Sequence, residues 1–430
     1  MSQSENLTRK YRVLHALTGA AGQARALSLA LRESGVAADC VLLGESRLGY
    51  KADHYIKRSG NDLRDIVEFL KRNIDNYDIF HFHFRPFFYE NSRDHRFPSF
   101  LDLLLIKAAG KKIVFHFRGS EVRFNDTFKK MSPYNYVDEN TAHLINRFPD
   151  QAKRRHIELV ESIADAVLVN DPEIGSYVGE STIINRIVDP GKFTYCGVSD
   201  TDCPLIIHAP SRRGVKGTDH ILAAVETLRA EGLSFNFQLI ENLNHDQALE
   251  AYKKADVIVD QLRIGWYGVL SVEAMSLGKA VLCYIRDDLA VNFNGKTPLL
   301  NTNPDTITEN LRRVIVDKQL RQSLSQNGYD WYTANHHRGV VTEKLIKVYD
   351  DVTSKTKPCD VKAYLELIDY QKTLSSTHDD PSLAWERLGF YDGGWHPKKV
   401  YSKAAFLLET QGVRSVFKRT VQRLFGKSSR

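Results

Sequence analysis

The sequence lacks any apolar run long enough to cross a membrane. No stretch of its 430 residues approaches about 18 consecutive apolar residues, so the sequence predicts no transmembrane helix. Residues Met1 to Lys10 are mostly polar and do not contain the apolar segment of a secretory signal. Cysteine is scarce, and the five cysteines form no C-x-x-C pair. These absences together favour a reduced protein of the cytoplasm.

Excess positive charge is also missing from most of the chain. The formal net charge is +6, but residues 395–430 contain nine Lys or Arg and one Glu, a net of +8. The rest of the chain therefore carries about −2. Because no basic surface is expected across the folded body, the sequence does not predict binding to nucleic acid.

What the chain does contain is a repeated alternation of strand and helix patterns. The apolar run Arg12 to Leu17 leads through a turn with Gly19 and Gly22 into a helical pattern at 23–33, and a second strand follows at 38–43. A similar strand, Leu205 to Pro210, begins the second half. This order predicts an α/β fold with two Rossmann-like domains, and 430 residues allow two separate cores.

One stretch, Ala255 to Ile285, combines the strongest signals. Two short β-branched runs, Val257 to Val259 and 280–285, flank a helical segment at 271–277 that Gly278 ends. The loop 264–268 therefore lies between the end of a strand and the start of a helix, where free backbone N–H groups and the helix dipole attract anions. A plain βαβ unit without a ligand is the alternative.

Two further turns have the composition of binding sites. Ser211 to Gly217 contains Arg212, Arg213 and Lys216 between a strand and a helix, which favours an anion site, although a solvated basic turn fits as well. The strand pattern at 78–84 places His81 and His83 on one face. We do not predict a metal site there, because no Cys or carboxylate has matching spacing.

The segment GVLSVEAMSLGKAV (268–281) resembles the nucleotide-sugar signature of the retaining glycosyltransferases with the GT-B fold, the large family four. In that family two Glu residues stand eight positions apart. Glu273 matches the second, which holds the donor ribose, and Gly265 stands at the first, which contacts the donor sugar. Similarly, Arg118 to Arg123 resembles the family's His-Gly-Ser-Asp-x-Arg turn, with Arg118 in place of His and Glu121 in place of Asp.

The resemblance implies a set of site residues between the two facing domains. Either His116 or Arg118 would lie by the transferring carbon of the donor, and either Arg212 or Arg213 would join Lys216 on the diphosphate. His83 would lie on the acceptor side. The residues implied for catalysis are His116, Arg118, Lys216 and Arg212, and those implied for donor binding are Gly19, Gly22, Arg212, Arg213, Lys216, Gly265, Gly268, Val269, Leu270 and Glu273.

The expected organisation is an N-terminal acceptor domain (1–190), a hinge near 188–204, a donor domain (204–352) and a helical basic extension (353–430). We expect transfer of a sugar from a nucleotide-sugar donor to a lipid-linked or saccharide acceptor, with retention and with neither metal nor other cofactor. A basic amphipathic helix at 413–425 predicts contact with an anionic membrane surface at the inner face. The alternatives are a non-catalytic partner subunit and a nucleotide-sugar epimerase or hydrolase of the same fold.

Overall fold

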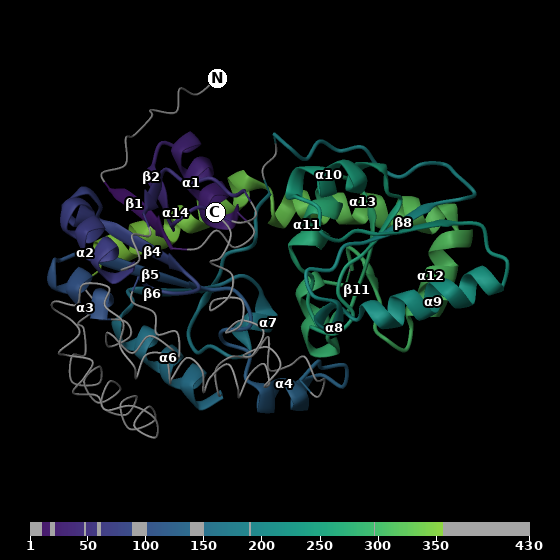
Figure 1. Ribbon diagram of the computed structural model, residues 1–430, viewed down its shortest axis with the longest axis horizontal. Coiled ribbons are helices and arrows are strands. Elements are labelled where there is room, and N and C mark those ends of the chain that lie inside the picture. The colour runs from purple at the N-terminus through teal and green to yellow at the C-terminus, as the bar shows by residue number, and fades with distance from the viewer. Residues whose placement is uncertain are drawn as a thin grey trace, which may run out of the picture.

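Two parallel β-sheets organise the chain into two lobes (Figure 1). The computed structural model describes residues 11–17, 22–46, 49–57, 62–87, 101–137, 150–188, 191–295 and 297–355. The first sheet has seven strands in the order β3-β2-β1-β4-β5-β6-β7, and the second has five in the order β12-β11-β10-β8-β9. Neighbouring strands are parallel throughout both sheets. The predicted α/β class with two Rossmann-like halves is confirmed.

The N-terminal lobe alternates strands and helices. Its strands are β1 Arg12–Ala16, β2 Ala37–Leu43, β3 His54–Ile56, β4 Ile79–His83, β5 Lys112–Phe117, β6 Ala166–Val169 and β7 Thr182–Ile183. Its helices are α1 Gln23–Glu33, α2 Asp62–Asn73, α3 Leu101–Ala108, α4 Asn125–Met131, α6 Asp150–Ile163 and α7 Pro172–Gly175, with a short 3-10 turn, η2 Ile74–Asn76, after α2.

The central strands of this lobe are apolar because both faces of the sheet are covered. Leu14, Phe80 and Phe115 belong to a buried cluster on the face that α3 and α6 cover. The alternate positions Val13 and Ile79 belong to a second cluster, which includes side chains of α1 and of the last helix. Each fully buried side chain of this kind contributes about 2 kcal/mol to folding, which explains why these strands read as continuous apolar runs.

The C-terminal lobe repeats the pattern on a smaller scale. Its strands are β8 Leu205–His208, β9 Asn236–Leu239, β10 Val257–Val259, β11 Ala280–Cys283 and β12 Leu300–Asn301. Its helices are α8 Arg213–Lys216, α9 Thr218–Ala230, α10 His245–Lys254, α11 Val269–Ser276, α12 Ile307–Val316 and α13 Lys318–Asn335, with the 3-10 segment η3 Asp287–Phe293 after β11. The last described helix, α14 Arg338–Ser354, follows α13.

The chain passes between the lobes twice, at adjacent places. Ile187 belongs to a cluster of the N-terminal lobe, whereas Val188 belongs to a cluster of the C-terminal lobe. On the return, Tyr332 still packs in the C-terminal lobe and Val341 packs against α1 and the first sheet. The helix α14 therefore lies on the N-terminal lobe, across which it runs in Figure 1. We propose that the two sheets are the cores of the domains expected at 1–190 and 204–352, with α14 as a returning segment.

Asp317 separates two helices near the end of the C-terminal lobe. It ends α12, and its side chain accepts a hydrogen bond from the Leu320 N–H, which starts α13 anew. The basic amphipathic helix at 413–425 and the whole extension from 356 lie outside the described residues, as does Gly19. Within the described part of the chain, no helix combines the length and apolarity that spanning a membrane requires.

Candidate active site between the two lobes

Two turns of the C-terminal lobe pack against the N-terminal lobe, at the edge where the strands of its sheet end. Val215, at the end of the basic turn, and Ile264, in the signature loop, both pack into the main cluster of the N-terminal lobe. Between these turns, Arg263 donates to the backbone carbonyls of Tyr134 at 3.1 Å and Asn135 at 2.6 Å. The structure therefore brings the two predicted binding turns to one junction with the first lobe.

Lys216 is held by groups of its own lobe. Its ammonium group donates to Asp260 at 2.7 Å and to Gln261 at 2.6 Å. The Asp260 carboxylate is fully buried and also accepts from the Gly268 N–H at 2.9 Å and the Ser271 hydroxyl at 2.7 Å. Burial alone would raise the pKa of Asp260, but Lys216 and these hydrogen bonds lower it below its usual value. Lys216 is thus fixed beside the N-terminus of α11, where Val269 and Leu270 begin the helix.

The two arginines that the sequence could not tell apart differ in their contacts. Arg213 forms a bidentate pair with Glu241, with distances of 2.9 and 2.5 Å, on the exposed side of the turn. Arg212 is also exposed. Because Arg213 is engaged by a carboxylate, Arg212 is the arginine of this turn that remains a candidate anion ligand beside Lys216.

Glu273 lies in the second turn of α11 and is paired with a histidine that the sequence analysis did not include. His245 Nε2 and Glu273 Oε1 are 2.7 Å apart, and this hydrogen bond raises the pKa of His245. The ring of Tyr50, from the N-terminal lobe, lies 6.4 Å from the His245 ring. Gly22 caps α1 with a φ of +66°, and an added Cβ there would lie 3.2 Å from Tyr50. These four residues meet across the junction.

Gly265, at the position of the family's first Glu, has a local reason to be glycine. Its φ is +96°, a conformation that residues with a side chain rarely adopt. An added Cβ would also lie 3.1 Å from the Cβ of Arg286. Arg286 itself is paired with Asp288 at 2.6 and 2.8 Å and donates to Ser176 of the other lobe at 3.0 Å. Arg286 therefore lies beside the position at which the family's first Glu would place its carboxylate.

The turn after β5 is shaped by its own acidic residue. Glu121 accepts hydrogen bonds from the backbone N–H groups of Arg118 and, at 2.9 Å, of Gly119. Arg123 forms a buried bidentate pair with Glu173 of α7, with its Nη2 to Oε2 distance at 2.7 Å. Residues 118–123 therefore form a turn that these hydrogen bonds hold in place. The turn sets the direction in which the Arg118 side chain leaves the backbone.

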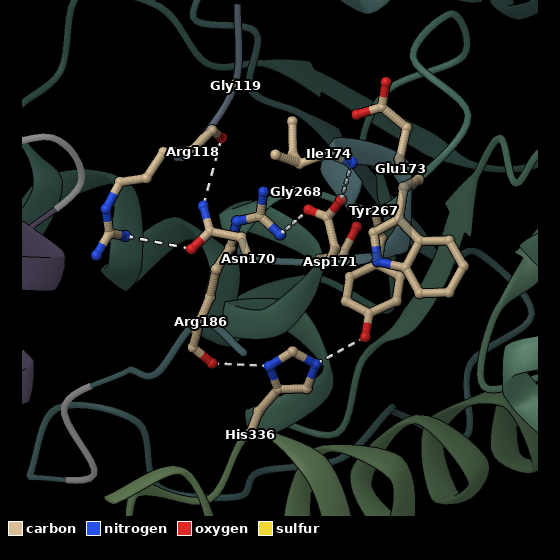
Figure 2. Close-up of polar contacts among 12 residues, drawn as sticks. Arg118, Gly119, Asn170, Asp171, Glu173, Ile174, Arg186, Tyr267, Gly268 and His336 are labelled. Atoms are coloured by element: carbon tan, nitrogen blue, oxygen red, sulfur yellow. Dashed lines mark hydrogen bonds and ion pairs between the residues drawn. The ribbon is translucent and has the colours of Figure 1, made fainter. Parts of the chain in front are cut away.

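Arg118 has only neutral partners for its guanidinium group. It donates to His83 Nδ1 through Nε at 3.1 Å and through Nη2. Its Nη1 donates to Asn170 Oδ1 at 3.4 Å (Figure 2). Among the described residues, no carboxylate lies within ion-pair distance of this group. Burial first, and then the charge of Arg186, lower the pKa of Arg118 to about 9 against the opposing charge of Glu121, so it remains a cation at neutral pH. A cation whose hydrogen-bond partners are neutral is suited to an anionic ligand.

His116 lies deeper than Arg118, in a layer of buried histidines. His83 and His116 are partners in the register of β4 and β5, and His15 and His81 are partners in β1 and β4. The rings stack at centroid distances of 4.2 to 5.6 Å. Among the described residues, neither ring nitrogen of His116 has a hydrogen-bond partner, although Asn170 is close enough to oppose part of the lowering of its pKa by burial. Of the two alternatives, His116 is buried and Arg118 is partly exposed.

Three of these histidines, His15, His81 and His83, are close enough together to be considered as metal ligands. The contacts favour a hydrogen-bonded network instead. His15 Nδ1 and His83 Nε2 are 2.8 Å apart, shorter than the roughly 3.3 Å that tetrahedral zinc imposes on two imidazole nitrogens. Arg118 donates to the other nitrogen of His83, which places a cation where a metal would add more positive charge.

A separate chain of hydrogen bonds fixes the signature loop to the crossing point of the lobes. Trp331 donates to the Tyr267 hydroxyl at 2.9 Å. Tyr267 contacts His336 Nε2 at 2.7 Å, and His336 Nδ1 contacts the Arg186 carbonyl at 2.7 Å (Figure 2). Because a carbonyl only accepts, His336 donates through Nδ1 and accepts from Tyr267. The Arg186 side chain in turn pairs with Asp171 at 2.6 Å.

Comparison with known proteins gives matches in structure and none in sequence. No family model and no curated protein matches the chain. Sucrose-phosphate synthase from Thermosynechococcus elongatus is 16% identical with a TM-score of 0.56, and the match covers 81% of this chain and 100% of that one. A glycosyltransferase from Rickettsia africae is 13% identical with a TM-score of 0.55, covering the same shares. HepE from Anabaena, solved in complex with UDP-glucose, is 13% identical with a TM-score of 0.52, covering 79% and 100%. The chain therefore has the GT-B fold, with two Rossmann-like lobes meeting at the junction described above.

Proposed function

We propose that this protein is a glycosyltransferase that binds a nucleotide-sugar donor between its two lobes and transfers the sugar to an acceptor with retention of configuration. The fold is one that includes proteins which bind such donors, because the Anabaena relative of the same fold was solved with UDP-glucose. The site residues of this chain support the proposal more directly than the fold does, since one fold serves several functions.

The observation that carries the proposal is the Arg118 guanidinium group, whose hydrogen-bond partners among the described residues, His83 and Asn170, are neutral. It comes from the N-terminal lobe, whose carboxyl edge receives the turns that contain Lys216 and the start of α11. The first N–H groups of a helix have no partner within the helix, so the N-terminus of α11 adds partial positive charge. These three groups together would place positive charge around an anionic donor without a metal ion.

Each group has a definite task in this proposal. Lys216, Arg212 and the N–H groups of Val269 and Leu270 would hold the diphosphate, whose negative charge grows as the bond to the sugar breaks. Because these donors are already oriented, they would stabilise that charge without reorganising. Glu273, oriented by His245, would accept hydrogen bonds from the ribose hydroxyls. Arg118 would lie against the donor near the transferring carbon.

On the acceptor side, the residue in question is His83. His83 reaches the junction only through Arg118, so we propose for it a supporting role and not direct contact with the acceptor. A lipid-linked or saccharide acceptor, and the attachment of residues 395–430 to an anionic membrane surface, remain proposals from the sequence. Co-sedimentation with anionic and neutral vesicles, with and without residues 395–430, tests the membrane proposal.

A non-catalytic partner subunit is the second candidate, and Gly265 is the observation that favours it. The left-handed backbone there and the neighbouring Arg286 exclude a simple replacement for the family's first Glu. A subunit of this kind would bind a donor weakly or not at all and would act only with a catalytic partner.

The decisive experiment measures nucleotide release from a panel of nucleotide sugars, starting with UDP-glucose, with and without lipid-linked acceptors. Binding of each donor is measured by calorimetry on the same protein. Arg212→Ala and Arg213→Ala form a matched pair. We expect the first to weaken donor binding at least about tenfold and the second to leave it unchanged, because Arg213 is occupied by Glu241. Equal effects of both variants would contradict the assigned site, and absence of any turnover would favour the partner subunit.

A further inference from the structure

A continuous chain of hydrogen bonds runs from Arg118 into the interior of the N-terminal lobe. Arg118 donates to His83 Nδ1, and His83 Nε2 lies 2.8 Å from His15 Nδ1. His15 Nε2 lies 3.5 Å from the Tyr349 hydroxyl, which is 2.6 Å from His81 Nδ1. The histidines and Tyr349 are all buried. The chain thus links the strands β1 and β4 to the helix α14.

The direction of every hydrogen bond in this chain follows from its first member. A guanidinium group has only donors, so His83 Nδ1 accepts and a neutral His83 carries its proton on Nε2. His15 Nδ1 then accepts from His83, and His15 carries its proton on Nε2, directed at Tyr349. The tyrosine hydroxyl accepts from His15 and has one acceptor left for its own proton, His81 Nδ1. The arrangement has one solution that satisfies each of these contacts.

We propose that His83, His15 and Tyr349 are positioning residues that hold the Arg118 guanidinium in the orientation that glycosyl transfer requires. This inference rests on the function proposed above, because it deepens the role given there to Arg118. The three residues act through one another and none of them need touch the substrate. Tyr349 would connect the site to α14, which follows the return of the chain from the C-terminal lobe.

The charges around the network agree with neutral histidines. Burial first, and then the charge of Arg118, lower the pKa of His15 to about 3 and the pKa of His83 well below its usual value. Burial, followed by His15, has the same effect on the pKa of His81. Burial raises the pKa of Tyr349, so its hydroxyl keeps its proton. A neutral His83 accepts from Arg118, whereas a protonated His83 would repel it.

The network makes a rigid support because an alternative tautomer breaks more than one contact. If His83 carried its proton on Nδ1, that N–H would face the donors of Arg118. The Nε2 atom of His83 would then need a donor from His15, and His15 would present a bare Nε2 to the Tyr349 hydroxyl. One proton on the wrong nitrogen therefore reverses the whole chain and releases Arg118.

The first test reads the tautomers directly and does not depend on activity. Nitrogen-15 spectra of protein labelled at histidine report, for each ring, which nitrogen carries the proton. At pH 7 we expect His15, His81 and His83 to be neutral with the proton on Nε2, assigned with His15→Asn and His83→Asn variants. A proton on Nδ1 of His83, or a doubly protonated His83, would overturn the inference.

The second test uses a matched pair at His15 that differs by one methylene group. In His15→Asn the amide oxygen lies near the position of Nδ1 and still accepts from His83, whereas in His15→Gln the amide reaches towards the position of Nε2. We expect His15→Asn to keep most of the native turnover. His15→Gln is expected to lower kcat at least about tenfold with little change in the donor KM, because the defect is one of orientation.

Folding of both variants is checked by thermal unfolding, and Tyr349→Phe provides a third variant that removes only the hydroxyl. Equal loss of kcat in His15→Asn and His15→Gln, with native-like unfolding, would overturn the positioning role. If the native protein releases nucleotide from no donor, the proposed function fails. In that case the histidine tautomers and the slow exchange of the Arg118 Nε–H still decide separately whether the network exists.

Discussion

The two lobes contain the same kind of parallel sheet but treat the charges at their strand ends differently. In the C-terminal lobe, Lys216 is paired with Asp260 and Glu273 is paired with His245. In the N-terminal lobe, Arg118 is surrounded by His83 and Asn170, which are neutral. At these positions, the C-terminal lobe gives Lys216 and Glu273 partners that can carry the opposite charge, whereas the hydrogen-bond partners of Arg118 in the N-terminal lobe are neutral.

This difference separates stability from function in the two halves of the site. A buried pair contributes to folding as long as both partners remain, and removal of one partner leaves an isolated charge. A buried cation whose hydrogen-bond partners are neutral has the opposite effect on stability. Its burial costs free energy of folding, which the binding of an anion recovers. Substitutions in the two lobes should therefore have different signatures, and four predictions test this.

The largest effect is expected on lowering the pH. His15, His81, His83 and His116 have pKa values lowered by burial, with His15 at about 3, whereas histidines in the unfolded chain titrate near 6.5. Below that pH the unfolded chain binds protons that the folded lobe cannot. The free energy of unfolding should therefore fall as the pH falls from about 6.5, by up to about 1.4 kcal/mol per pH unit for each of these histidines.

Urea unfolding followed at pH 7, 6 and 5 measures this slope. His116→Phe is the control, because it removes one titrating ring and keeps the stacked layer, so its slope should be smaller by about one proton. A free energy of unfolding that is constant between pH 7 and 5 would show that these histidines are not held neutral.

The next largest effect is expected for Lys216→Met, which leaves the fully buried Asp260 carboxylate without its cation. The free energy of unfolding should fall by about 3 kcal/mol, and donor affinity should fall at least about tenfold. Addition of Asp260→Asn should restore stability and not donor binding. Chemical denaturation and calorimetry measure the two quantities, and a stable single variant would show that the pair is not important for folding.

Arg118→Gln should lower activity strongly and stability little, in contrast to Lys216→Met. The amide can still donate to His83, but the positive charge is lost, so kcat should fall at least about 100-fold, as when an aligned charged donor is removed from an active site. The free energy of unfolding should change by less than about 1 kcal/mol, because no carboxylate loses a partner. Nucleotide-release kinetics and urea unfolding measure both. A variant with a much lower free energy of unfolding and an unchanged kcat would show that Arg118 contributes to stability and not to catalysis. That outcome would contradict the difference proposed between the lobes.

The smallest effect is expected for Glu273→Gln. Donor affinity should fall about tenfold, and the pKa of His245 should fall because its hydrogen bond to the carboxylate is weakened. A raised pKa in the folded state contributes stability below about pH 6.5, which is lost as the pH rises through the folded pKa. This contribution should be absent from the variant and small in the native protein, since His245 is partly exposed. Calorimetry and an NMR titration of His245 check both, and an unchanged His245 pKa would contradict the pairing.

Much of the fold could be predicted because long elements have clear periodicity. The helix Gln23–Glu33 was predicted with the bounds that the structure has, since Gly22 marks its start and Leu27 and Leu31 recur at helical spacing. The edge strands β3, β7 and β12 were missed. A strand of two or three residues is too short to show a period, and its existence depends on a neighbour that supplies hydrogen bonds.

The candidate site was predicted only in part, for a similar reason. The sequence placed Lys216, Arg118 and Glu273 at the ends of strands or the starts of helices, which is a local property. It did not include His15, His245 or Tyr349. The only available signal for His15 was its position near the end of a central strand, in the same place as His81 on the next strand.

By itself, the sequence determined which turns carry charge, because strand, glycine and helix patterns follow one another along the chain. Only the tertiary structure decided what each charge meets. Arg212 and Arg213 are neighbours in sequence, yet Glu241 of the next strand-end loop engages Arg213, while Arg212 stays exposed. The histidine layer forms because three parallel strands end at one edge and α14 returns to cover it. Contacts of this kind depend on how distant segments pack, and no local pattern encodes them.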